Sequence, residues 1–119
     1  AQVASPRMQK GPLGSGAVRL APGAETMGLA EGIEDALSAM QATGVNTWAA
    51  LGAKRLSKVV IPPECERLII FADPDEPGRK AAEETAHRHR ERGLRVEVRY
   101  PPGAGDWNDA LRAEVRANA

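Results

Sequence analysis

Short apolar runs alternate with longer amphipathic stretches between residues 27 and 100. Residues 27–30, 45–51 and 68–72 are dense in apolar side chains and predict strands. The run at 68–72 is continuous, as in a strand that is covered on both faces. Residues 94–100 alternate between apolar and charged side chains, which predicts a half-exposed strand near the edge of a sheet. Residues 17–20 could add a short edge strand.

Two stretches between these strands have helical periodicity. The first begins after residue 32, and Gly44 is placed to end it. The second runs from about residue 77 to residue 92, with small alanines inside and a charged outer face on which His87 and His89 are expected to be exposed. A last helix is predicted after residue 102, with Trp107 on its apolar side. The expected apolar face of the first helix consists of Ile33, Ala36, Leu37 and Met40.

The elements follow the order β-α-β-β-α-β-α, with helical crossovers between strands. Such crossovers predict an α/β fold in which a mostly parallel sheet of about four strands has helices on both faces. The Gly-, Pro- and Ala-rich start predicts a flexible extension over residues 1–16, followed by one domain over residues 17–119. The chain opens with neither Met nor a helical pattern, which favours a piece of a longer protein.

The 119-residue chain is 42% hydrophobic and 27% charged, as in an ordinary soluble globular protein. Its formal net charge is zero, which argues against a free-standing nucleic-acid binder because phosphate contacts need a surplus of Lys and Arg. Cys65 is the only cysteine, so no internal disulfide or cysteine-based zinc site can form, and a reducing cytoplasm is expected. No apolar run approaches the ~18 residues needed to span a membrane.

Acidic residues follow the predicted strands. Glu31 follows the first of these strands, Asp73 and Asp75 follow the buried run, and Asp106 comes after the last strand. Ligands of α/β sheets bind at the carboxyl ends of the strands. Because clustered carboxylates repel one another unless a cation shares them, the pattern indicates a hard divalent metal, in the first place Mg²⁺. The chemistry predicted from this pattern is metal-dependent phosphoryl transfer.

Each acidic position also has a purely structural interpretation. Asp73 and Asp75 point to the same side of an extended backbone, yet Asp75 also suits the N-cap of the next helix. Taken alone, Glu31 is better explained as a first-turn acid that interacts with the helix dipole, and Asp106 as another N-cap. The second motif also has the spacing of a calcium EF-hand loop, but a strand precedes it and Pro77 fills an oxygen-donating position, so that interpretation is rejected.

The ordered combination of motifs resembles the Toprim domain, the catalytic module of DnaG-type primases and of type IA and type II topoisomerases. Glu31 and Asp35 match the primase form of the first motif, and residues 73–82 look like the primase version of the second. Residues 105–109 are similar to the third motif of phage- and plasmid-type primase–helicases. Residues 49–52 resemble the turn after the second strand in this group.

The resemblance implies a role for each acid. Asp73, Asp75 and Asp106 would hold Mg²⁺, with Mn²⁺ as a possible substitute, directly or through water. Glu31 would be a metal ligand or a general acid/base, and Asp35 a supporting acid of the metal site. Glu31, Asp73 and Asp75 are the implied catalytic residues. The metal would neutralise triphosphate charge and help to align the attacking 3′-hydroxyl.

Basic residues leave two interpretations open. Arg79 and Lys80, near the start of the second helix, could contact phosphate or be solvated surface charges. The basic segment around Lys54 is predicted to be surface. The match to the family departs in small ways, since Pro77 stands where Ala is common and Gly105 where a Lys often precedes the Asp.

The resemblance implies Mg²⁺-dependent nucleotidyl transfer by the catalytic module of a DNA primase or primase–helicase that makes RNA primers. The DNA template and nucleoside triphosphates would be bound with the help of further primase or helicase domains. No zinc module or basic subdomain is visible, so the isolated chain is expected to bind Mg²⁺ weakly and to make no primers. A Toprim-type nuclease and a non-catalytic replication scaffold are the alternatives. A topoisomerase is disfavoured because the only tyrosine, Tyr100, lies in a predicted strand.

Overall fold

The computed structural model describes residues 17–101 and Trp107. Within them, five strands form one sheet in the order β1-β3-β2-β4-β5. Neighbouring strands are parallel except that β1 pairs antiparallel with β3. The predicted α/β class and mostly parallel sheet are confirmed, and the optional edge strand is present. The strands are β1 (Val18–Arg19), β2 (Thr26–Ala30), β3 (Thr47–Ala49), β4 (Arg67–Phe71) and β5 (Arg95–Arg99).

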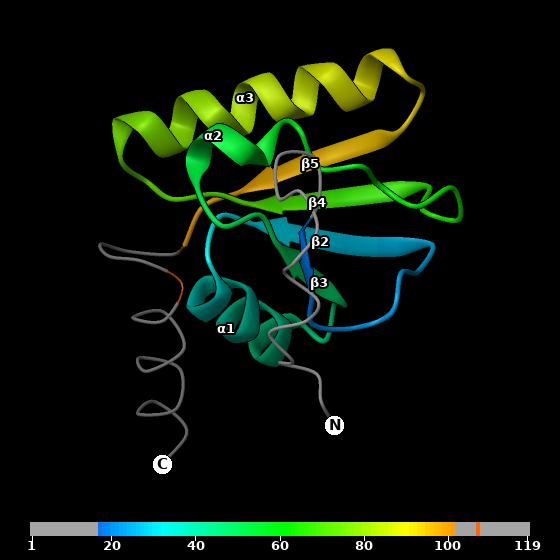
Figure 1. Ribbon diagram of the computed structural model, residues 1–119, viewed down its shortest axis with the longest axis horizontal. Coiled ribbons are helices and arrows are strands. Elements are labelled where there is room, and N and C mark those ends of the chain that lie inside the picture. Colours follow the sequence, from blue (N-terminus) through cyan, green and yellow to red (C-terminus); the bar gives the residue numbers. More distant parts are fainter. Residues whose placement is uncertain (1–16, 102–106, 108–119) are drawn as a thin grey trace.

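Three helices connect the strands in residues 17–101: α1 (Ile33–Thr43), α2 (Ala53–Leu56) and α3 (Glu76–Glu91). Figure 1 shows α1 on one face of the sheet and α3 on the other, with α2 beside α3. Helices on both faces were expected, but the short α2 was not. No helix in the described part of the chain is long and apolar enough to span a membrane. The predicted extension at 1–16 and, Trp107 apart, the predicted last helix lie outside the described residues.

The interior strand β4, between β2 and β5, is buried on both faces, as its continuous apolar run predicts. Leu68 and Ile70 pack on the side of α3, whereas Ile69 and Phe71 pack on the side of α1. This split follows from the alternation of side chains along a strand. On α3, the small residues predicted for its inner face let the helix lie close to the sheet. These residues, Ala81, Ala82 and Ala86, are all buried.

The predicted apolar face of α1 is partly wrong. Ile33 and Leu37 are 37% and 48% exposed, while Ala36 and Ala39 are fully buried. Two small side chains let the helix approach the sheet closely, so the bulkier apolar residues are left at the rim of the interface. Periodicity located the helix correctly but placed its buried face about one position away from the true one.

The prediction that both histidines are exposed is also wrong for one of them. His89 is 1% exposed, and its Nε2 atom has no hydrogen-bond partner. It follows the buried Ala82 and Ala86 at helical spacing, so it shares their face. Burial lowers the pKa of His89. His87 is on the outer face as predicted, where it lies 3.3 Å from Glu91.

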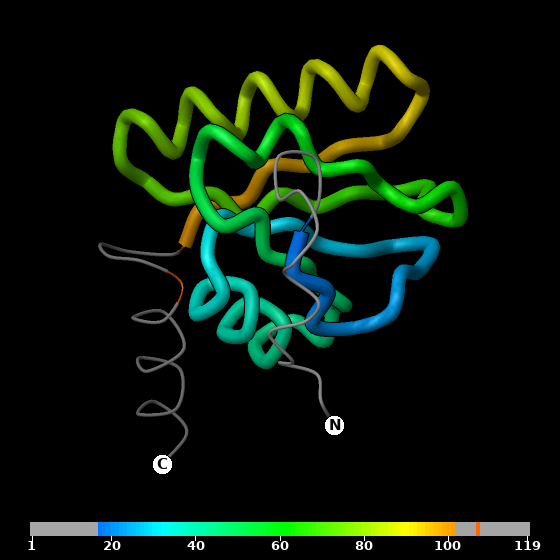
Figure 2. Tube along the Cα trace, viewed as in Figure 1, coloured from blue at the N-terminus to red at the C-terminus, as the bar shows by residue number. Residues whose placement is uncertain are grey.

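The carboxyl ends of four strands meet at one edge of the sheet. Ala30 at the end of β2 is in register with Ala49 of β3 and Phe71 of β4, and Phe71 is in register with Arg99 of β5. Figure 2 shows the chain leaving β2, β4 and β5 on the same side of the sheet, at the left of the view. The residues that follow these strands are therefore brought close together.

Candidate active site

Glu31 and Asp73 are brought together at this edge. Their side chains share a hydrogen bond, although they belong to loops more than forty residues apart along the chain. Burial, this bond and the charge of Asp73 raise the pKa of Glu31 from 4.5 to about 7. The charges of Asp75 and Asp35 push the pKa of Glu31 in the same direction. Near neutral pH, Glu31 therefore carries a proton for much of the time.

One oxygen atom of the Glu31–Asp73 pair has an unsatisfied hydrogen-bonding capacity. Oδ1 of Asp73 is buried and has no hydrogen-bond partner. A buried polar atom without a partner is costly, and a bound cation would remove that cost. The same cation would also relieve the repulsion between the two carboxylates. The donor set at Glu31 and Asp73 therefore fits a divalent metal ion.

The donor set also limits which kind of metal site this is. Among residues 17–101 and Trp107, no group of three or more His, Cys, Asp or Glu side chains is arranged to hold a metal by itself. Mg²⁺ in proteins is usually bound through one or two carboxylates together with waters and substrate phosphates, without an all-protein cage. A carboxylate pair at the edge of a sheet suits that mode of binding.

The other acids predicted for the metal site differ in their structural surroundings. Asp75 is the N-cap of α3, and its Oδ1 accepts a 2.7 Å hydrogen bond from the Gly78 amide, so the structural interpretation is confirmed for it. Its carboxylate still contributes negative charge at Glu31. Asp35 is partly buried in the first turn of α1 and does the same. Asp106 lies outside the described residues. Metal binding by these three acids remains a prediction.

A close approach at Gly78 shapes the loop between Asp73 and Asp75. A Cβ atom at Gly78 would lie 2.6 Å from Cβ of Asp73, 2.7 Å from its carbonyl oxygen and 2.8 Å from Oδ1 of Asp75. The first turn of α3 can therefore sit against both aspartates only because residue 78 has no side chain. This role was not predicted, although the signal was a glycine three residues after the N-cap.

A strained turn after β3 supports the backbone of Glu31. Leu51 has a φ of 67°, which is uncommon for a residue with a side chain, and Gly52 follows with a φ of 131°. The Gly52 amide donates a 2.9 Å hydrogen bond to the Glu31 carbonyl oxygen. Strained backbone of this kind clusters at functional sites. The turn itself was expected, but its contact with Glu31 was not.

Trp107 anchors the chain beside the candidate site. It is 6% exposed, its ring meets Phe71 edge-on at 5.1 Å between ring centroids, and its Nε1 donates to the Ala72 carbonyl oxygen at 3.2 Å. Ala72 directly precedes Asp73. The prediction that Trp107 is on an apolar side is confirmed, since it belongs to the core cluster around Phe71.

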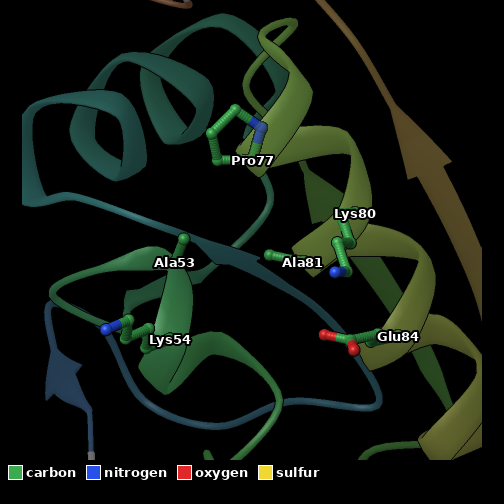
Figure 3. A pocket seen from close by; sticks show the side chains of 6 residues that line it. All are labelled: Ala53, Lys54, Pro77, Lys80, Ala81 and Glu84. Carbon is green, nitrogen blue, oxygen red and sulfur yellow. The ribbon is translucent and has the colours of Figure 1, made fainter.

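The two predicted phosphate contacts differ in their surroundings. Arg79 donates from Nε to the Pro74 carbonyl oxygen at 2.9 Å, and its guanidinium lies 4.9 Å from the centre of the Tyr100 ring. Lys80 instead lines a pocket of about 260 Å³ between α2 and α3. Figure 3 shows this pocket with α2 on one side and α3 on the other. The remaining lining residues are Ala53, Lys54, Pro77, Ala81 and Glu84.

The raised pKa of Glu31 predicts a pH-dependent difference in stability. The folded-state pKa of about 7 lies above the ordinary value of 4.5, so Glu31 stabilises the metal-free fold below pH 4.5 and loses that effect as pH rises through 7. Glu31→Gln cannot ionise. At about pH 8 the variant should exceed the wild type in unfolding free energy by roughly 1–2 kcal/mol after solvent screening, and near pH 4.5 the two should be similar.

Chemical unfolding in the presence of a chelator measures this difference. The lowered pKa of His89 has the opposite effect on stability, because the stability that His89 contributes is lost as pH falls. This contribution is the same in wild type and in Glu31→Gln, so it cancels in the difference. Glu34→Gln, an exposed acid in the first turn of α1, is the matched control. An equal difference between Glu31→Gln and wild type at both pH values would contradict the carboxyl pair.

Comparison with known proteins places this geometry in a family. Residues 26–117 match the Toprim domain. The primase fragment of the bacteriophage T7 primase-helicase protein aligns with 92% of this chain and 50% of its own length, with a TM-score of 0.66 and 24% identity. A DNA primase domain from Pseudomonas aeruginosa aligns with 95% of this chain and 40% of its own, with a TM-score of 0.64 and 24% identity. Curated protein sequences yield no match.

At this level of identity, the two solved structures establish a likeness of fold. The chain spans 50% and 40% of their lengths, so they contain a large part that has no counterpart here. The family match covers residues 26–117, more than half of the chain, and includes both Glu31 and Asp73. The chain therefore belongs to the Toprim domain family.

Proposed function

We propose that this domain is the catalytic module of a DNA primase or primase–helicase, which joins nucleotides into RNA primers on a DNA template. The observation that carries the proposal is the Glu31–Asp73 pair, with a buried Asp73 oxygen that lacks a partner. The pair lies at the carboxyl edge of the sheet, where ligands of α/β folds bind. Family membership and the fold shared with two primase structures support the same conclusion.

In this proposal, Glu31 and Asp73 hold a divalent cation, Mg²⁺ or Mn²⁺, with Asp75, Asp35 and Asp106 as supporting acids. When bound, the ion would neutralise phosphate charge during transfer. A 3′-hydroxyl attacks the α-phosphate of a nucleoside triphosphate, a new phosphodiester bond forms and pyrophosphate leaves. Glu31 is the proposed acceptor of the hydroxyl proton. Its raised pKa of about 7 describes the metal-free site. The close approach of Gly78 to Asp73 limits the positions that the Asp73 carboxylate can take.

The proposed phosphate contact is Lys80, together with Lys54 across the pocket. The two ammonium groups belong to α3 and α2, both of which begin just after residues of the candidate site. A triphosphate held near Glu31 and Asp73 would gain from positive charge on this side. Arg79 is already engaged with Pro74 and Tyr100 and is a weaker candidate for this role.

The proposed partners follow from the length of the chain relative to its structural matches. This domain corresponds to half or less of each matched primase chain. We infer that template and nucleotide binding need further primase domains, and that a helicase domain is a candidate neighbour. The zero net charge of this chain agrees with a template-holding surface that lies elsewhere.

Primer synthesis on single-stranded DNA tests the function. The full-length protein should make labelled RNA primers from nucleoside triphosphates only when Mg²⁺ or Mn²⁺ is present. The isolated 119-residue chain should bind the metal weakly and make none. Template-directed primers from the isolated chain would contradict this division of labour. Metal-dependent cutting of DNA without synthesis would indicate a nuclease, and intact function after Asp73→Ala would indicate a scaffold.

A further inference from the structure

Arg79 makes two contacts that tie it to the loop of the candidate site. Its Nε atom donates a 2.9 Å hydrogen bond to the carbonyl oxygen of Pro74, the residue between Asp73 and Asp75. Its guanidinium also lies over the ring of Tyr100, 4.9 Å from the ring centre. Two directional contacts use both the edge and the face of the planar group, so its position is defined although the residue is exposed.

These contacts connect three parts of the fold. Arg79 belongs to the first turn of α3, Pro74 to the loop after β4, and Tyr100 follows β5. The end of β5 is itself joined to β4, because the Ala72 amide donates to the Arg99 carbonyl oxygen at 2.9 Å. The loop that carries both aspartates is thus held from α3 on one side and from the end of β5 on the other.

We propose that Arg79 is a positioning residue that fixes the loop carrying Asp73 and Asp75, and is not a phosphate contact. The expected effect of Arg79 on metal affinity rests on the proposed function. The expected effect of Arg79 on the order of the loop does not. Groups that orient metal ligands typically change metal affinity by 10–100-fold when they are removed. Lysine cannot replace Arg79 in this role, since it lacks the planar group that can stack on Tyr100 while donating to Pro74.

Arg79→Lys separates positioning from charge. A phosphate contact would largely survive this substitution, because the positive charge remains. A positioning role predicts that Mn²⁺ binding by the 119-residue chain, followed by electron paramagnetic resonance, weakens about tenfold. Tyr100→Phe keeps the ring and should bind Mn²⁺ like the wild type. Tyr100→Leu removes the ring face and should weaken binding by about threefold.

Arg90→Lys is the matched control. Arg90 lies near the other end of α3 and donates from Nη2 to the Val96 carbonyl oxygen at 2.8 Å, which is the same kind of exposed contact. Both arginine variants should lower the melting temperature by similar small amounts. Only Arg79→Lys should weaken Mn²⁺ binding, and equal weakening in Arg90→Lys would overturn the proposal.

A second measurement needs no metal. The Gly78 amide donates to Oδ1 of Asp75, so its hydrogen exchange reports the order of this loop. In a chelator, Arg79→Lys should accelerate exchange at Gly78 about tenfold relative to wild type and to Arg90→Lys. Unchanged exchange would overturn the positioning role whatever the metal data show. Accelerated exchange in a wild-type background that binds no Mn²⁺ would support the loop role and refute the proposed function instead.

Discussion

Replacing Asp73 by asparagine is expected to reduce primer synthesis by the full-length protein at least about a hundredfold. Loss of a group that only orients a metal ligand already costs up to about a hundredfold, so loss of a direct ligand should cost no less. Asparagine has nearly the same shape but no charge. It also removes a charge that opposes ionisation of Glu31, so the metal-free fold should be as stable as the wild type or more stable.

The measurement compares initial rates of primer synthesis over a range of Mg²⁺ concentrations, beside unfolding curves of the same proteins. Glu76→Gln is the matched control, because Glu76 is an exposed acid in the first turn of α3 next to Asp75. It should keep nearly full activity. Retention of more than about a tenth of wild-type activity in Asp73→Asn, or an equal loss in Glu76→Gln, would count against Asp73 as a ligand.

Gly78→Ala is expected to damage both the fold and the site. Alanine in a helix is favoured over glycine by up to about 1 kcal/mol. Against this gain stands a Cβ atom 2.7 Å from the Asp73 carbonyl oxygen and 2.6 Å from its Cβ, where backbone must move. Overpacking of this kind costs about 1–3 kcal/mol. The net effect should be a loss of about 1–2 kcal/mol in unfolding free energy, together with displaced aspartates and weakened metal binding.

Urea unfolding and Mn²⁺ titration of the same variant check both parts. Gly32→Ser is the control, because a Cβ at Gly32 meets no atom within 4 Å, and serine can cap the start of α1. It should leave stability unchanged or raise it by a few tenths of a kcal/mol. A Gly78→Ala protein as stable as wild type with unchanged metal affinity would show that the loop moves at little cost.

Patterns of apolar residues predicted most of the fold, because the spacing of apolar residues within a short segment indicates which faces of a strand or helix are buried. The continuous run in β4 indicated a strand covered on both faces and the alternation in β5 indicated a strand near an edge, and both are confirmed. The buried face of α1 and the burial of His89 were mispredicted for a common reason. Small or polar side chains of α1 and α3 face the sheet at these positions. The hydrophobicity of a residue alone does not show how closely its helix approaches the sheet.

The site was predictable where acids follow strands, and not where the backbone shapes the loops. Strand order at the carboxyl edge brings Glu31 and Asp73 together, which the spacing of motifs anticipated. The contact of Gly52 with the Glu31 backbone and the double contact of Arg79 depend on loop conformations. Such conformations depend in part on residues distant in sequence, such as Tyr100 for Arg79 and Glu31 for Gly52. The sequence motifs therefore identified the acidic residues of the candidate site. They did not identify the residues whose contacts hold the loops of that site in place.

The most direct test of the central claim is a titration of the 119-residue chain with Mg²⁺ near pH 7, followed through the backbone amide resonances of Glu31 and Asp73. Saturable shifts centred on these two residues are predicted. Binding should weaken as pH falls below 7, because the proton on Glu31 competes with the metal, and it should be lost in Asp73→Asn. Resonances that stay unmoved throughout the titration, or that move equally in Asp73→Asn, would contradict a metal site at this pair.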